Sequence, residues 1–208
     1  MRSQTSQVRI IHSALSWLSP ALKGWTEANE RYAQAFRGDD ALYWWDERPN
    51  IGALAAGAWL GGLVAIEEYK AFKGEAKLTD KPNGRTDLFI SQRNGLNAAV
   101  IEAKMHWWGK GESGRLATKM LKACADACRN NEIDTRIGCS FVIPRWEKKR
   151  ASQHDIDDFV TEAQGSAGKL DALAWSFPIS ARELHPPNKN SKFVYPGILI
   201  AMRLARTK

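Results

Sequence analysis

Helical and strand-like hydrophobic spacing alternate along the chain and divide it into a succession of expected elements. Near the amino terminus, apolar residues at helical spacing predict helices over 8–18 and 22–36. The uncharged, Ala- and Gly-rich run 51–66 (IGALAAGAWLGGLVAI) indicates a buried helix that leads into a strand. This run is shorter than the roughly 20 residues that cross a bilayer, so we expect no membrane partner.

The middle of the chain changes to strand patterns and then returns to a helix. Strands are predicted over 64–72, 85–91 and 98–106, because each run is apolar or alternating and ends at polar or turn-forming residues. Apolar residues at helical spacing predict a helix over 113–130. The uninterrupted apolar run 137–143 predicts a strand that is covered on both faces. The expected order is therefore helix, three strands, helix, strand.

The carboxyl-terminal part adds a predicted helix over 156–164, capped at His154-Asp155, and strands over 173–179 and 193–204. Between these strands, residues 184–192 (LHPPNKNSK) are expected to form a mobile loop. A chain of 208 residues with 44% hydrophobic and 25% charged residues has the composition of a soluble globular domain, which excludes an intrinsically disordered chain, and the order of helices and strands predicts the α/β class.

A predicted hairpin turn sets the register of two of these strands. Asn94-Gly95 is the favoured dipeptide of a two-residue type I′ turn between 85–91 and 98–106. With this pair at the centre, Asp87 lies directly opposite Glu102, and Arg85 lies opposite Lys104. Lys104 projects from the same face as Glu102, because the side-chain period of a strand is two.

Two carboxylates that face each other on a sheet repel and require a compensating charge. Mg²⁺ is suited to such a pair, because it takes oxygen ligands from one or two carboxylates together with water and phosphate oxygens. The neighbouring Lys104 can then orient or deprotonate an attacking water molecule. The alternative is a surface ladder in which Lys104 only pairs with an acid across the sheet, but the apolar neighbours Leu88, Val100 and Ile101 argue against it.

The segments GRTDLFI (84–90) and VIEAK (100–104), within this order of elements, resemble the PD-(D/E)XK nuclease superfamily. The resemblance covers 46–143 and departs at Thr86, where the family has proline. It implies a restriction-endonuclease-like core, with a helical amino-terminal extension over 1–45 and a nuclease-like domain over 46–208. It also implies that Asp87 and Glu102 bind Mg²⁺, or Mn²⁺ in its place, and that Lys104 assists the nucleophilic water.

The family carries a further acid, usually on the helix that precedes the first strand. Glu47 is the closest match, and Glu67 and Glu68 at the start of the strand are the alternatives. We favour Glu47 because an acid on the strand would crowd a third negative charge against the carboxylate pair. The glycines within 57–62 are expected to let this helix pack closely against the sheet.

The charge balance favours an anionic partner, since the chain carries a formal net charge of +7 and has a pI near 9.4. Two groups of basic residues are candidates for phosphate contacts. A solvated basic face is an equal alternative for the group on the helix and a slightly less favoured one for the group in the loop. The two groups are Arg115, Lys119 and Lys122 on the predicted helix, and Arg145, Lys148, Lys149 and Arg150 after the last core strand.

Together these features predict a cytoplasmic, Mg²⁺-dependent endonuclease that hydrolyses phosphodiester bonds, with DNA favoured over RNA as the substrate. The cytoplasm is favoured because the three cysteines lack the spacing of a redox pair or zinc site. A catalytically silent nuclease-like subunit for nucleic-acid binding or assembly is the main alternative, and a toxin or defence nuclease acting on RNA is another. The resemblance also allows a homodimer or a larger assembly, because many enzymes of this fold dimerise. The sequence leaves open whether cleavage is endonucleolytic or exonucleolytic, and which sequences are cut.

Overall fold

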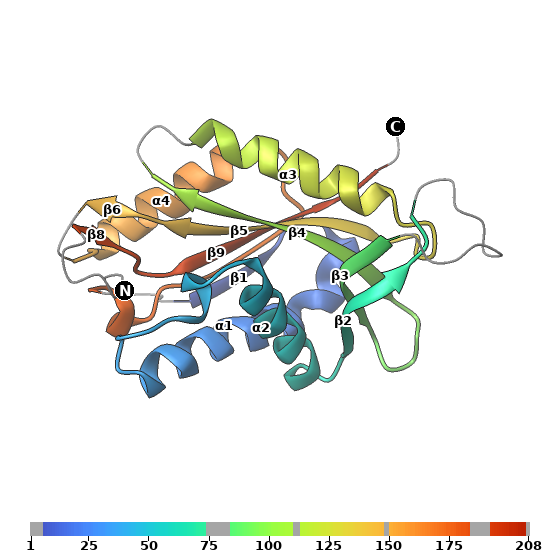
Figure 1. Cartoon of the computed structure of the whole chain (residues 1–208), viewed down its shortest axis with the longest axis horizontal. Helices are drawn as coiled ribbons and strands as arrows, with labels where there is room; N and C mark the ends of the chain where they lie inside the picture. The colour runs from blue at the N-terminus through green and yellow to red at the C-terminus, as the bar shows by residue number, and fades with distance from the viewer. Residues whose placement is uncertain (1–5, 74–83, 110–112, 148–149, 184–191, 207–208) are drawn as a thin grey trace.

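A seven-stranded mixed sheet separates two layers of helices in the computed structural model, which describes residues 6–73, 84–109, 113–147, 150–183 and 192–206 (Figure 1). The strand order is β1-β7-β9-β5-β4-β3-β2, and every described pair of neighbours is antiparallel except β4 and β5. The strands are β1 (Ser6–Ile10), β2 (Val64–Ala71), β3 (Gly84–Ser91), β4 (Ala98–Trp108), β5 (Arg136–Pro144), β7 (Ala172–Ser176) and β9 (Ile198–Leu204).

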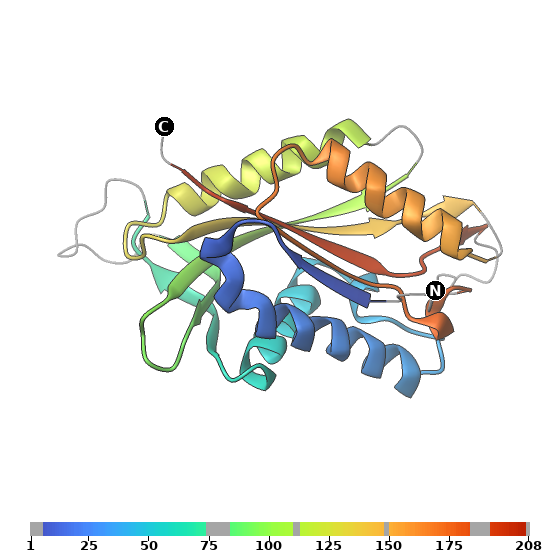
Figure 2. The same ribbon diagram turned by 180° about the vertical axis from the view of Figure 1, so that it is seen from behind.

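Helices cover both faces of this sheet (Figures 1 and 2). One layer holds α1 (Ser19–Ala35) and α2 (Glu47–Leu60), and the other holds α3 (Ser113–Cys128) and α4 (Gln153–Ser166). The short 3₁₀ helices are η1 (Ser13–Leu18), η2 (Leu42–Trp44) and η3 (Ile179–Ala181), and a separate two-stranded sheet pairs β6 (Trp146–Glu147) with β8 (Phe193–Val194). The fold is therefore a mixed α/β sandwich.

Each side of the sheet has its own hydrophobic core. The core under α1 and α2 contains Trp25 and Tyr43, and the core under α3 and α4 contains Phe159. Strand β5 contributes to both, because Phe141 faces the first core and Val142 faces the second. The prediction that this apolar strand is covered on both faces is thus confirmed.

The predicted succession of helix, three strands, helix and strand is present as α2, β2, β3, β4, α3 and β5. The predicted helix over 22–36 is present as α1. The helix α4 begins earlier than predicted, because Ser152 rather than His154-Asp155 supplies the N-cap, in a capping box with Asp155. The expected mobile loop over 184–192 lies almost wholly outside the described residues.

The chain begins differently from the prediction. The expected helix over 8–18 is wrong, because Ser6–Ile10 is a strand that pairs with β7 and only Ser13–Leu18 is helical, as a 3₁₀ turn. Val8 and Ile10 both pack against the α1/α2 core, a spacing of two that belongs to a strand. The expected strand over 193–204 is likewise divided into β8 and β9, with Pro196 between them.

The Ala- and Gly-rich helix α2 is buried by contact with α1. A Cβ atom at Gly57 would lie 2.4 Å from the backbone nitrogen of Trp25, and one at Gly24 would lie 2.4 Å from the carbonyl oxygen of Gly57. The expectation that glycines bring α2 close to the sheet is therefore wrong for Gly57, which brings α2 close to α1. None of the described helices combines the length and apolar character that a membrane crossing needs.

Candidate active site where β3 separates from β4

The β3–β4 hairpin has the predicted register but not the predicted turn. Its ladder runs from Ser91–Ala98 to Leu88–Ile101, as expected from a turn centred on Asn94-Gly95. The connection is a longer loop over 92–97, in which the Asn94 side chain accepts a hydrogen bond from the Leu96 N–H at 3.1 Å. The prediction of a two-residue turn is thus wrong, because the local Asn94 bond favours a wider loop.

Both ladders of β3 are interrupted at Asp87. The pairing with β4 ends at Leu88, and the pairing with β2 passes over Glu68, which has a left-handed φ of 52°. Asp87 is therefore not paired directly with Glu102, and Arg85 is paired with Lys70 of β2 rather than with Lys104. The predicted direct opposition is wrong because the strands separate one residue before it.

Two carboxylates occupy the gap that this separation leaves beside β4. The N–H of Val100 points to the β5 side, so the N–H groups of Ala103 and Met105 point to the side from which β3 has departed. Asp87 Oδ2 accepts the Ala103 N–H at 2.8 Å. The Met105 N–H faces the Glu47 carboxylate and lowers its pKa. Each carboxylate thus replaces a strand acceptor, which keeps buried backbone donors satisfied.

Glu47 comes from the first turn of α2 and reaches the site from the opposite layer to α3. Burial raises the pKa of Glu47, the charge of Lys104 lowers it, and the charge of Asp87 raises it, with a net increase. The structure therefore brings Glu47 together with Asp87 and Lys104.

The two alternatives to Glu47 lie elsewhere. The Glu68 carboxylate pairs with Arg48 at 2.9 Å and also with Arg85, and the hydrogen bond from Arg48 lowers its pKa. Glu67 lies beside Gly52 of α2: a Cβ atom added at Gly52 would be 3.5 Å from Oε2 of Glu67. The backbone of Glu68 is left-handed, with a φ of 52°, a conformation that ordinarily costs about 1–2 kcal/mol for a non-glycine residue.

Glu102 is nearly inaccessible and is paired with a lysine that the sequence did not indicate. Its side chain is 4% exposed, and its Oε1 lies 2.7 Å from Nζ of Lys73, whose side chain is 11% exposed. Burial raises the pKa of Glu102, the Lys73 hydrogen bond lowers it, and the Asp87 charge raises it, with a net increase. The Asp87 and Glu102 carboxylates therefore repel each other, as the sequence predicted, although they are not a ladder pair.

Lys104 is held by α3 rather than by an acid across the sheet. Its Nζ lies 3.0 Å from Oδ2 of Asp126 and donates to the carbonyl oxygen of Ala103 at 2.8 Å. Burial lowers the pKa of Lys104, but the Asp126 hydrogen bond and the charges of Asp126, Glu47 and Asp87 outweigh it, so the pKa is raised. Lys104 is therefore a protonated hydrogen-bond donor.

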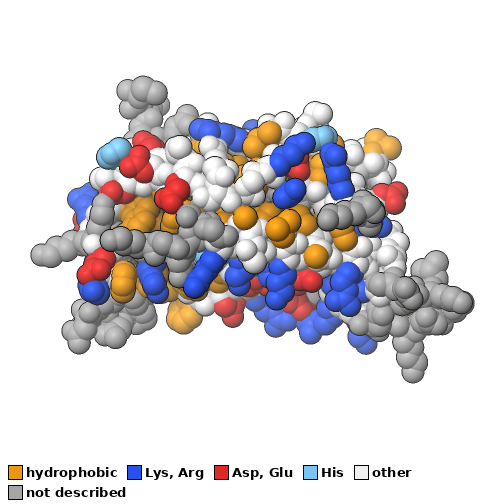
Figure 3. All heavy atoms as spheres, turned by 90° about the horizontal axis from the view of Figure 1, so that it is seen from above, with side chains coloured by type: hydrophobic (Ala, Val, Ile, Leu, Met, Phe, Trp, Pro, Cys, Tyr) orange, Lys and Arg blue, Asp and Glu red, His pale blue; other side chains and the backbone are white. Residues whose placement is uncertain are grey.

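The predicted phosphate-binding residues are distributed unevenly. Arg115, Lys119 and Lys122 follow one another along α3 at helical spacing, and the charge of Lys119 reaches Glu47. Figure 3, which faces the α3/α4 layer, shows many Lys and Arg side chains along one long edge, with Asp and Glu side chains among them and further basic side chains near the opposite edge.

The two described members of the second basic group have separate partners. The Arg145 guanidinium lies over the Phe193 ring at 4.9 Å, and Arg150 pairs with Glu183 at 3.1 Å. Lys148 and Lys149 lie outside the described residues.

The residues at the site suit a hard divalent cation by donor type. Asp87, Glu102 and Glu47 offer carboxylate oxygens, which Mg²⁺ and Mn²⁺ prefer. In the described parts of the chain, no three His, Cys, Asp or Glu side chains are already grouped around one point for a metal. Asp87 and Glu102 instead use Oδ2 and Oε1 for the Ala103 N–H and the Lys73 ammonium.

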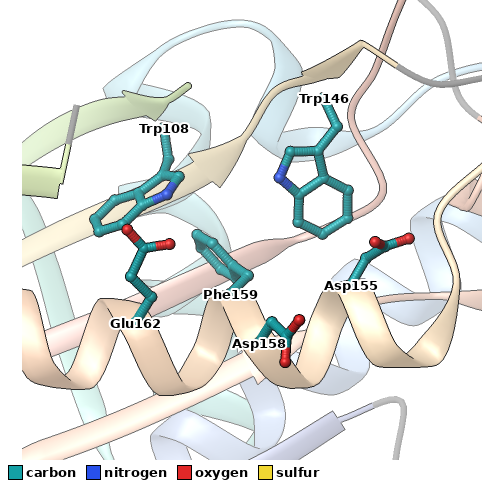
Figure 4. Close-up of a pocket in the computed structure, with 6 residues that line it drawn as sticks. All are labelled: Trp108, Trp146, Asp155, Asp158, Phe159 and Glu162. Atoms are coloured by element: carbon teal, nitrogen blue, oxygen red, sulfur yellow. The ribbon is translucent and has the colours of Figure 1, made fainter. Parts of the chain in front are cut away.

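Away from this site, a groove lies between α4 and the ends of β4 and β6 (Figure 4). This groove has a volume of about 180 Å³ and is lined by Trp108, Trp146, Asp155, Asp158, Phe159 and Glu162. Figure 4 shows the Glu162 carboxylate beside the Trp108 indole, with Asp158 and Asp155 farther along α4 on the side of Trp146. The negative charge of the groove is unsuited to a phosphate backbone.

The sequence missed two side chains of the site, Lys73 and Asp126. Asp126 had a detectable signal, because it continues the helical spacing of Lys119 and Lys122 and is acidic in a basic series. Lys73 had none, since its position depends on a bridge between Lys73 and Asn130, which follows α3.

Comparison with known proteins gives no relative from which a function could be transferred. No protein-family model, curated protein or solved structure matches this chain.

Proposed function

We propose that the protein is a divalent-metal-dependent nuclease of the PD-(D/E)XK type that hydrolyses phosphodiester bonds of nucleic acid, DNA in preference to RNA, in the cytoplasm. The supporting observation is the convergence of Asp87, Glu102, Lys104 and Glu47 at the point where β3 separates from β4. In this proposal α2, β2, β3, β4, α3 and β5 form a restriction-endonuclease-like core.

Asp87 and Glu102 would hold the metal ion. Once bound, Mg²⁺ or Mn²⁺ would polarise the phosphate and lower the pKa of water. Burial and mutual repulsion of the two carboxylates favour a cation between them, because an ionised, buried carboxylate is costly unless a positive charge compensates it.

Lys104 and Glu47 would have complementary proton-related roles. Because its pKa is raised, Lys104 stays protonated and can orient water or donate to a phosphate oxygen, rather than remove a proton. The pKa of Glu47 is also raised, which brings a carboxylate closer to the range in which a general base is effective. We therefore assign proton removal to Glu47 and orientation to Lys104.

The proposal is tested by cleavage assays on supercoiled plasmid, linear duplex, single-stranded DNA and RNA, each with Mg²⁺, Mn²⁺ or EDTA. We expect metal-dependent cleavage that falls at least about 100-fold in Lys104→Ala. Lys70→Ala, an exposed lysine on β2, is the matched control and should retain full activity. Cleavage in EDTA, or full activity of Lys104→Ala, would reject the proposed chemistry.

The identity of the fourth residue has its own test. Glu47→Gln should lower cleavage by at least about tenfold, a loss of about 1.4 kcal/mol of transition-state stabilisation. Glu67→Gln and Glu68→Gln should cleave like the wild type. The reverse pattern would move the fourth position to β2.

A catalytically silent, nucleic-acid-binding or assembly subunit is the second candidate. It is favoured by one observation, that Lys73 and Asp126 already neutralise Glu102 and Lys104 without a metal. Isothermal titration with Mn²⁺ separates the two candidates. Nucleic-acid binding without metal-binding heat and without cleavage would support the silent subunit.

A further inference from the structure

Lys73 forms an ion pair in the interior of the candidate site. Its Nζ lies 2.7 Å from Glu102 Oε1, and the two side chains are 11% and 4% exposed. The backbone of this segment is fixed independently of the ion pair, by a bridge between Lys73 and Asn130 and by a hydrogen bond from the Asn131 N–H to the Phe72 carbonyl at 3.4 Å. The backbone position of Lys73 therefore does not depend on the ion pair, and only its side chain has to move for the ammonium to leave Glu102.

The two lysines of the site, Lys104 on β4 and Lys73 just after β2, have different partners. Lys104 pairs with Asp126 of α3, whereas Lys73 pairs with Glu102 itself. A buried glutamate without a positive partner strongly destabilises a fold, so Lys73 compensates a charge that would otherwise oppose folding. A divalent cation at Glu102 would supply the same compensation and would repel the ammonium group.

We propose that Lys73 is an internal counter-ion, which holds Glu102 in the metal-free protein and releases this carboxylate when a divalent cation binds. The inference rests on the proposed function, because it takes Glu102 as a metal ligand. Lys73 is a suitable exchangeable partner, since its ammonium is a compact charge on a flexible stem rather than a rigid fork. Metal binding and the ion pair are then mutually exclusive, and each weakens the other.

The test uses Lys73→Met, which retains an apolar stem and removes the charge. Isothermal titration with Mn²⁺ should show affinity at least about tenfold higher than the wild type, because the competing charge is gone. Thermal unfolding in EDTA should occur at a lower temperature than in the wild type, and saturating Mn²⁺ should remove most of this difference. Lys70→Met, an exposed lysine on β2, should change neither quantity.

Lys73→Arg is an independent variant. It keeps the positive charge beside Glu102, so we expect it to fold like the wild type. Arginine binds carboxylates through two parallel hydrogen bonds, so it should hold Glu102 more firmly and lower the Mn²⁺ affinity. Unchanged or weaker Mn²⁺ binding by Lys73→Met, or unchanged or tighter binding by Lys73→Arg, would overturn the counter-ion role.

The same titration distinguishes the two levels of inference. If the wild type binds Mn²⁺ and cleaves DNA but neither Lys73 variant shifts the affinity, only the role of Lys73 is rejected. If the wild type neither binds Mn²⁺ nor cleaves nucleic acid, both the proposed function and the counter-ion role are rejected.

Discussion

The Asp87 carboxylate has two separate effects, one as a hydrogen-bond acceptor and one as a negative charge. Its Oδ2 accepts the Ala103 N–H that a regular β3 would have paired, and its negative charge raises the pKa of Glu102. The first role needs only an acceptor, whereas the second arises from the charge. A neutral amide of the same shape therefore separates structure from function at this position.

Asp87→Asn should abolish Mg²⁺-dependent cleavage while leaving the protein as stable as the wild type, or more stable, in EDTA. The asparagine Oδ1 can still accept the Ala103 N–H, and loss of the negative charge relieves the repulsion with Glu102. Thermal unfolding in EDTA and plasmid cleavage in Mg²⁺ measure the two effects. Unfolding far below the wild-type temperature would show that the fold needs the charge.

Glu47 makes the stability of the metal-free protein depend on pH. Its pKa in the folded protein lies above the ordinary value of 4.5, chiefly through burial, so the folded state binds the proton more tightly than the unfolded state does. Stability from this group is therefore present at low pH and is lost as the pH rises from 4.5 through the raised pKa.

Glu47→Gln should remove this dependence. Relative to the wild type, the variant should gain stability as the pH rises through that window, because its side chain never ionises. Urea unfolding in EDTA at several values from about pH 4 to 8 measures the difference. Glu27→Gln, at an exposed position on α1, controls for the amide substitution. A constant difference between Glu47→Gln and wild type would contradict the raised pKa.

At the scale of elements, the sequence predicted best where burial alone decides the structure. The run that became β5 has apolar residues on both faces, and the run 51–60, which forms most of α2, is uncharged and rich in Ala, Gly and Leu, so tertiary packing could only reinforce each pattern. Ser6–Ile10 was missed because a short strand at the sheet edge takes its structure from its partner, β7. A partner so distant in sequence leaves no local signal.

Part of the site was predictable because a local sequence signal fixed the pairing of β3 with β4. The Asn94-Gly95 pair lies at the centre of the β3–β4 connection, so it placed Asp87, Glu102 and Lys104 close together even though the turn itself is wider. The separation of the strands at Asp87 could not be predicted, because it depends on the left-handed Glu68 in β2 and on acceptors supplied by side chains. Lys73 required knowledge of how the end of β2 meets the residues after α3.

Helix α2 begins at Glu47, so the packing of α2 against α1 helps to fix the position of Glu47. Gly57 lies at this helix–helix contact, and Gly57→Ala should destabilise the protein by about 1–3 kcal/mol, the usual cost of overpacking. The added Cβ would lie 2.4 Å from the Trp25 nitrogen and 2.5 Å from the Ala21 carbonyl oxygen, and both are backbone atoms that cannot move independently. Denaturant unfolding measures the loss.

Gly165→Ala is the matched control for this helix–helix contact. Gly165 also lies within a helix, α4, but nothing lies within 4 Å of the position that its Cβ would occupy. The substitution should therefore stabilise the protein by about 0.5–1 kcal/mol through the lower entropy of the unfolded chain. Equal effects of the two substitutions would show that α1 and α2 adjust without cost.

Over the whole molecule, the charges on the α3/α4 layer are separated. The groove beside α4 carries Asp155, Asp158 and Glu162, whereas α3 carries the basic residues that lead toward Glu47. A polyanion approaching this face is therefore repelled at α4 and attracted along α3. For the proposed nucleic-acid substrate, this distribution predicts a path along α3 rather than over the aromatic groove of Figure 4.

The salt dependence of nucleic-acid binding tests this path. Replacing Arg115, Lys119 and Lys122 together with alanine should weaken binding to a similar extent for all sequences, because phosphate contacts carry no sequence information. The slope of log affinity against log salt concentration should shrink by roughly 1 for each contact removed. Arg31→Ala is the control, because Arg31 is exposed on α1 in the opposite helix layer, and its slope should stay near the wild-type value. A larger change of slope in Arg150→Ala than in the triple variant would place the nucleic acid beyond β5 instead of along α3.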